Sequence, residues 1–71
     1  MTNILNAIVN RVVKQVITYH RMGYYLTLDD VVDMVYDELE KQNVRLIADY
    51  DDYIKDEVLK RVGKYLLKKA N

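Results

Sequence analysis

The sequence predicts an all-α fold, a small three-helix bundle that forms one domain over residues 1–71. The chain contains no proline and two glycines, so little interrupts helix formation. Apolar side chains recur at helical spacing in three separate segments. A chain of this length buries only about 60% of the surface that its unfolded state exposes. Because cysteine is absent, we expect helix packing or self-association to supply the stability.

The first predicted helix spans residues 3–21, and Asn3 or Thr2 can cap its start. A step of about 100° per residue places its apolar side chains on one arc of the helical wheel. The members of this arc are Leu5, Ile8, Val9, Val12, Val13, Val16 and Ile17. The arc covers roughly half of the wheel, whereas an ordinary surface helix has a stripe of about 100°. We therefore expect this helix to pack against a second chain as well, in a symmetric homodimer.

The second predicted helix spans residues 28–42 and follows an extended linker. Gly23 ends the first helix because glycine accepts the left-handed conformation. Thr27 and Asp30 have the spacing of a capping box, which fixes the start of the second helix. The apolar stripe consists of Leu28, Val31, Val32, Val35, Tyr36 and Leu39. The opposite face carries Asp29, Asp33, Asp37 and Glu40.

The third predicted helix follows an apolar connector at 44–48, which is either a strand stub or a buried loop. Asn43 can end the helix before it. The residues that can cap the third helix are Asp49, Asp51 and Asp52. This helix is expected to run to about Lys69. Across all three helices, the predicted core consists of Leu5, Ile8, Val9, Val12, Val16, Leu28, Val31, Val35, Leu39, Ile54, Val58, Val62 and Leu66.

Charges are segregated along the chain, although they sum to zero. Residues 1–27 carry three cations and no acid, and residues 58–71 carry five cations and no acid. All eleven acids lie in residues 28–57, together with three cations. The second helix is therefore expected to be acidic, and the outer faces of the other two basic.

Two interpretations of this charge pattern remain open. In the first, the charged faces are only solvated, and ion pairs four residues apart stabilise each helix by about 0.2–0.5 kcal/mol per pair. The expected pairs are Asp37–Lys41, Asp56–Lys60 and Glu57–Arg61. In the second, a charged face meets a partner, because complementary charge speeds encounter and sets orientation.

The sequence favours a small protein-interaction or regulatory module. Tyr24 and Tyr25, at the joint between the first two helices, either roof a small core or bind a partner, because tyrosine offers area and a hydrogen bond at low entropic cost. The candidate interaction residues are Asp29, Asp33, Asp37, Glu40, Tyr24 and Tyr25. The alternative is a helix-turn-helix-like nucleic-acid-binding protein, in which the basic face of the third helix follows the phosphate backbone. That face consists of Lys60, Arg61, Lys64 and Lys68.

No catalytic, metal or cofactor site is visible in the sequence, so we expect a protein that is not an enzyme. The single histidine, His20, suits a helix C-terminus better than a metal site. Carboxylate pairs such as Asp33 and Asp37 lie on a polar face, whereas general acid–base catalysis needs a carboxyl group in an unusual environment. No run approaches the roughly 18 apolar residues of a membrane span. Since no secretory signal is visible either, we expect a cytoplasmic protein.

Overall fold

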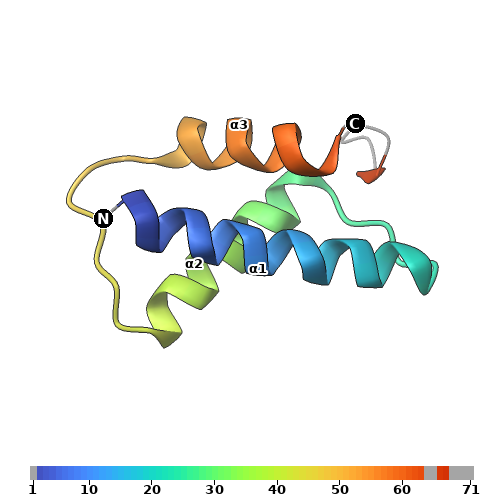
Figure 1. Ribbon diagram of the computed structural model, residues 1–71, viewed down its shortest axis with the longest axis horizontal. Helices are drawn as coiled ribbons and strands as arrows, with labels where there is room; N and C mark the ends of the chain where they lie inside the picture. Colours follow the sequence, from blue (N-terminus) through green and yellow to red (C-terminus); the bar gives the residue numbers. More distant parts are fainter. Residues whose placement is uncertain (1, 64–65, 68–71) are drawn as a thin grey trace.

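The computed structural model describes residues 2–63 and 66–67, and within them three helices surround one core (Figure 1). The helices are α1 (Thr2–Arg21), α2 (Leu28–Lys41) and α3 (Asp51–Val62). Each helix contacts both of the others, and the molecule measures 34 × 21 × 18 Å. The predicted all-α three-helix fold is confirmed. The connector at 44–48 forms no strand in the part of the chain that the structure describes.

The core is built mostly from valines, which lie on the facing sides of the three helices. The buried side chains are Leu5, Ile8, Val9, Val12, Val13, Val16, Val31, Val32, Val35, Leu39, Ile54, Val58 and Val62. Val13 and Val32 are therefore core residues that the predicted core omitted. Leu28 and Leu66 were predicted in the core, and both are only partly buried at its edge.

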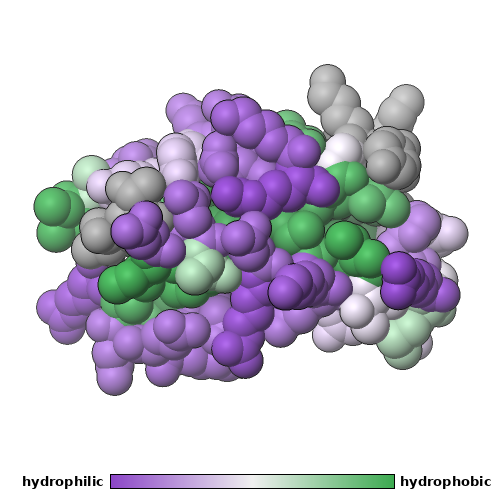
Figure 2. All heavy atoms as spheres, in the orientation of Figure 1, coloured by the Kyte–Doolittle hydropathy of each residue, from purple (hydrophilic) through white to green (hydrophobic). Residues whose placement is uncertain are grey.

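The wide apolar arc of α1 is used within a single chain. This helix packs against α2 and α3 at once, so two neighbours share its apolar side chains. Val9, Val12 and Val16 are at most 1% exposed. The dimer expected through α1 stays a prediction, and it would have to form on another face of this helix. Figure 2 shows that hydrophilic side chains cover most of the face on which α1 and α3 lie, with hydrophobic patches between them.

Short-range signals set the boundaries of α2. The Thr27 hydroxyl accepts the Asp30 amide at 3.1 Å, and the Asp30 carboxylate accepts the Thr27 amide at 3.1 Å. The predicted capping box is thus confirmed. Gly23 has φ +90° after α1 and Asn43 has φ +56° after α2, so both predicted helix ends lie in left-handed backbone. At the start of α3 the N-cap residue is Tyr50, without a side-chain cap, so the aspartates predicted to cap this helix are not its N-cap; the Asp49 carboxylate instead accepts the Asp51 amide at 2.9 Å.

The prediction that the third helix reaches Lys69 is wrong. The helix ends at Val62 because Gly63 has φ +79° and ψ +154°, a conformation that essentially only glycine adopts. Leu66 and Leu67 then pack, partly buried, against the core outside any α-helix. Lys69 itself lies outside the described residues.

Candidate functional site

The four acidic residues predicted for interaction form one exposed stripe along α2. Asp29, Asp33, Asp37 and Glu40 are all exposed, and their spacing of three or four residues places them on one helical face. We call these four residues the acidic stripe. None of them forms an ion pair with any described residue, and the expected pair between Asp37 and Lys41 is absent there. Their side chains therefore face solvent without an ion-pair partner in the described part of the chain.

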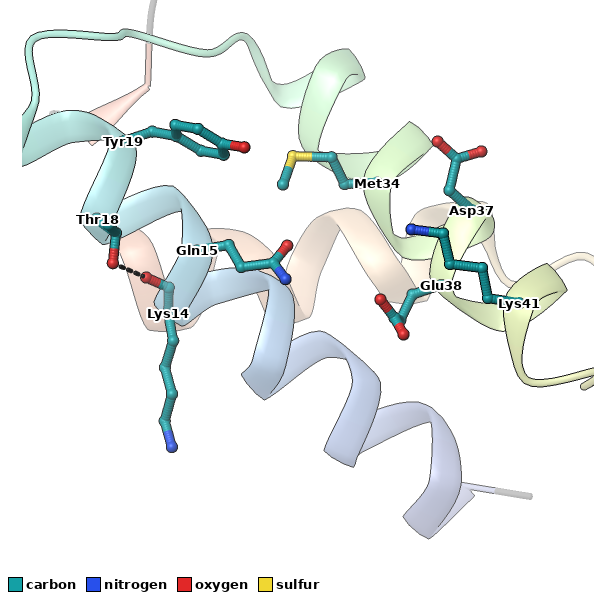
Figure 3. Close-up of a pocket in the computed structure, with 8 residues that line it drawn as sticks. All are labelled: Lys14, Gln15, Thr18, Tyr19, Met34, Asp37, Glu38 and Lys41. Atoms are coloured by element: carbon teal, nitrogen blue, oxygen red, sulfur yellow. Dashed lines mark hydrogen bonds between the residues drawn. The ribbon is translucent and has the colours of Figure 1, made fainter.

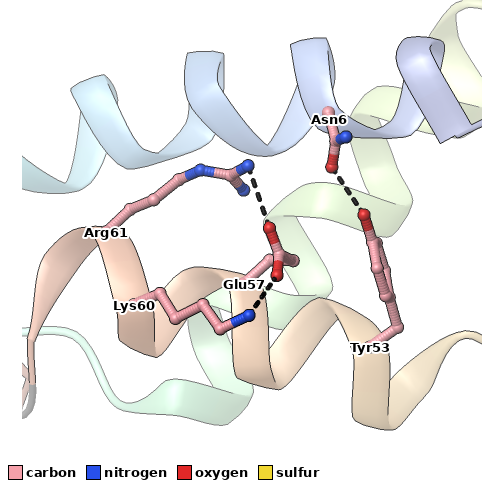
Figure 4. Close-up of polar contacts among 5 residues, drawn as sticks. All are labelled: Asn6, Tyr53, Glu57, Lys60 and Arg61. Carbon is pink, nitrogen blue, oxygen red and sulfur yellow. Dashed lines mark hydrogen bonds and ion pairs between the residues drawn. The ribbon is translucent and has the colours of Figure 1, made fainter.

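The cations of α3, by contrast, are paired within their own helix. The Glu57 carboxylate accepts Lys60 Nζ at 3.2 Å and Arg61 Nη2 at 3.0 Å (Figure 4). Lys55 Nζ lies 3.7 Å from an Asp51 carboxylate oxygen. The predicted Glu57–Arg61 pair is confirmed, whereas Lys60 pairs with Glu57, one turn away, and not with Asp56.

This pairing reduces the charge available for nucleic acid on the third helix. Lys60 and Arg61 share one carboxylate, and Arg61 reaches inward toward α1 (Figure 4). The Nη1 atom of Arg61 is buried and has no hydrogen-bond partner among the described residues. Lys64 and Lys68, the other half of the predicted basic face, lie outside the described residues. Of the four predicted cations, the structure thus describes two, Lys60 and Arg61.

The joint between α1 and α2 exposes an ordered aromatic cluster. Tyr24 and Tyr25 are 61% and 58% exposed, so they do not cover the hydrophobic core. The Tyr24 ring packs edge-to-face on Tyr19, with ring centroids 6.3 Å apart. Tyr25 packs in the same way on His20, at 5.0 Å. These contacts hold both rings in place while leaving most of their surface open.

A groove of about 560 Å³ between α1 and α2 connects the aromatic joint to the acidic stripe (Figure 3). Tyr19, which holds Tyr24, lines one end of the groove, and Met34 lies between the two helices. Asp37 of the acidic stripe lines the α2 side. The complete lining is Lys14, Gln15, Thr18, Tyr19, Met34, Asp37, Glu38 and Lys41. Of the predicted interaction residues, Asp37 thus lines the groove itself, and Tyr24 contacts the groove residue Tyr19.

Sequence reasoning missed Tyr19, Met34 and Lys14 as parts of this surface. Each lies at the edge of an apolar arc or on a polar face, where a helical wheel gives no sign of a groove. Only the pairing of α1 with α2 brings them together, and that pairing is a tertiary contact. The only hint in the sequence was that apolar and polar side chains alternate at the boundary between the two faces of each helix.

Two tyrosine hydroxyls fix α3 against its neighbours. Tyr36 Oη donates to Asp51 Oδ1 at 2.6 Å, which joins α2 to the first turn of α3. This hydrogen bond, aided by desolvation and by the charges of Asp51 and Asp49, raises the pKa of Tyr36 to about 12. Tyr53 Oη donates to Asn6 Oδ1 at 2.7 Å and joins α3 to α1 (Figure 4). Because they bind within the chain, we assign these hydroxyls a structural role.

The described residues show no grouping suited to metal binding. Nowhere among them do three histidine or carboxylate side chains come close enough to hold an ion. His20 lies in the last turn of α1, as expected for a helix-end histidine. No described helix has the length and apolar character needed to cross a bilayer. Comparison with protein-family models, curated proteins and solved structures finds no match, so the geometry above carries the functional assignment.

Proposed function

We propose that the protein is a cytoplasmic, non-catalytic interaction module that docks the acidic stripe onto a basic surface of a partner protein. The observation that carries this proposal is the charge balance of α2. This helix contains six acids and one cation, and the acidic stripe forms no ion pair with any described residue. Charges left open in this way steer a basic partner and set its orientation.

The neighbouring groove and aromatic joint supply the apolar part of the contact. Complementary charge mainly raises the association rate and fixes the orientation of the partners. Affinity depends on a few large side chains that become buried and exclude water. Tyr24 and Met22, 61% and 64% exposed, are large side chains of the type found in such anchors. A partner that covers the acidic stripe and the groove reaches Tyr19 and then Tyr24 along the same surface. The partner's basic surface could equally be one that otherwise holds nucleic acid.

The test compares two matched pairs of charge-neutralising substitutions. One variant carries Asp33→Asn and Asp37→Asn in the acidic stripe, and the control carries Asp52→Asn and Asp56→Asn on α3. All four residues are exposed, so both variants should keep the fold, which circular dichroism verifies. Cross-linked partners from the source cells are identified by mass spectrometry for each variant. We expect the wild type and the control to retain the same protein, and the stripe variant to lose it.

Two results would overturn the proposal. The first is a partner that the stripe variant retains as well as the control does. The second is a salt-sensitive complex with a short DNA duplex, measured by fluorescence anisotropy, that Lys60→Ala weakens and the stripe variant does not. That second result would establish the nucleic-acid function in place of the protein-interaction function.

A further inference from the structure

The outer face of α1 carries a basic stripe whose position mirrors the acidic stripe of α2. Helix α1 contains three cations and no acid. Arg11 and Lys14 are exposed, and they form no ion pair with any described residue. Steps of three or four residues connect them to exposed apolar side chains at both ends of the helix. We call this row the basic stripe, and its members on α1 are Ile4, Ala7, Arg11, Lys14 and Thr18, with Met22 directly after the end of the helix.

The basic and acidic stripes flank the same groove but do not meet within one chain. Lys14 lines the α1 side of the groove, and Asp37 lines the α2 side. Figure 3 shows the Lys14 side chain extending away from α2, with its ammonium group far from the Asp37 carboxylate. Lys14 and Asp37 therefore line the same groove without pairing within the chain.

We infer that a second copy of this chain docks on this face, with α1 of each copy lying on α2 of the other. A two-fold axis through the groove superposes a basic stripe on an acidic stripe twice, which is the self-complementarity that a symmetric dimer requires. Lys14 of one copy then meets Asp37 of the other, and the reverse contact forms at the same time. The exposed Ile4 and Met22, 48% and 64% exposed, lie at the two ends of this contact. This inference rests on the proposed function, because it gives the acidic stripe its first partner.

The polarity of the face defines the expected dimer. Charged residues occupy the middle of the contact, so added salt screens the attraction between copies. A weak dimer that dissociates as ionic strength rises is therefore expected.

Charge reversal on each stripe gives a decisive experiment. Sedimentation velocity over a concentration series is measured for the wild type, for Lys14→Glu and for Asp37→Lys, each alone. Each substitution places like charges at both copies of the contact, so the dissociation constant should rise at least about tenfold. An equimolar mixture of the two variants should restore the dimer, because both contacts in the mixed pair are then attractive. The control, Asp56→Lys on α3, should dimerise as the wild type does.

Each other outcome overturns the inference. These outcomes are a wild type that is monomeric at every concentration, single variants that dimerise normally, or a mixture that fails to associate. Restoration in the mixture cannot come from repair of a misfolded variant, since each protein is unchanged in the mixture. If the protein is monomeric but its acidic stripe still captures another protein from cells, the homodimer is refuted and the proposed function is retained. If the protein dimerises but captures its partner protein equally well without the Asp33 and Asp37 carboxylates, the proposed function is refuted and the homodimer is retained.

Discussion

Replacing Tyr36 with Phe is expected to loosen the attachment of α2 to the start of α3. The phenol lies 2.6 Å from the Asp51 carboxylate, and both residues are half-buried. A hydrogen bond to a charged group contributes about 1.5–3 kcal/mol to stability. Since solvent reaches both groups, we expect Tyr36→Phe to lower the free energy of unfolding by about 1–2 kcal/mol. Urea denaturation followed by circular dichroism near neutral pH measures this loss, which corresponds to roughly 4–8 °C in Tm per kcal/mol.

The effect of Tyr36→Phe should also depend on pH in a defined direction. The pKa of Tyr36 is raised from 10.0 to about 12, first by the hydrogen bond to Asp51. A raised folded-state pKa means that the stabilisation is fully present below about pH 10, where the unfolded phenol keeps its proton. It is lost as the pH rises from about 10 to about 12, because the unfolded state then releases the proton more readily. The difference between wild type and variant should shrink across that window.

Two comparisons can refute this reasoning about Tyr36. Tyr24→Phe removes a hydroxyl from a ring that is 61% exposed, so its effect should stay within about 0.5 kcal/mol. A double-mutant cycle with Asp51→Asn isolates the contribution of the pair from other effects of each substitution. If Tyr36→Phe behaves as Tyr24→Phe does, or if the cycle gives no interaction energy, the hydrogen bond does not form in solution.

Three further predictions concern the fold, and urea denaturation checks each of them. Ile54→Ala, at a position that is 0% exposed, should cost about 2–5 kcal/mol, whereas Ile47→Ala, at one that is 89% exposed, should cost at most about 0.5 kcal/mol; equal costs would contradict the described core. Thr27→Ala removes the hydroxyl of the capping box and should cost about 1 kcal/mol, so an unchanged midpoint would argue against that cap. Gly23→Ala should cost about 1–2 kcal/mol through backbone strain alone, because φ is +90° and a Cβ would meet nothing within 4 Å; a stabilised variant would place Gly23 outside left-handed backbone.

Local chemistry explains why the sequence predicted the helices well. The start of α2 depends on two side chains three residues apart, Thr27 and Asp30, and the ends of α1 and α2 depend on single residues with left-handed backbone. Apolar periodicity needs only the helical repeat, so it identified most of the core. Exposure of the acidic stripe followed from the same periodicity, since those residues lie opposite the buried valines.

Features that depend on contacts between helices could not be predicted in this way. The wide arc of α1 suggested a second chain, and the structure instead uses it to hold both α2 and α3. The apolar spacing continues past Gly63 to Leu66, so a helical wheel extends α3 through a residue that in fact ends it. Lys60 has a carboxylate three residues before it and another four before it, and sequence alone could not choose between them. The groove needs two helices, and neither helix shows it alone.

The distribution of charge sets α3 apart from the other two helices. Helix α3 contains four acids and three cations, so its charges nearly cancel within a turn or two. Helix α2 contains six acids and one cation, and α1 contains three cations and no acid. At physiological ionic strength a surface charge is screened over about 8 Å, so a partner responds mainly to the charges that it contacts directly. A partner docked as proposed on the α1–α2 side would contact cations of α1 and acids of α2, whereas one docked on α3 would contact charges of both signs. We therefore expect the separation of the two stripes, which the net charge of zero does not reveal, to set the orientation of a docked partner.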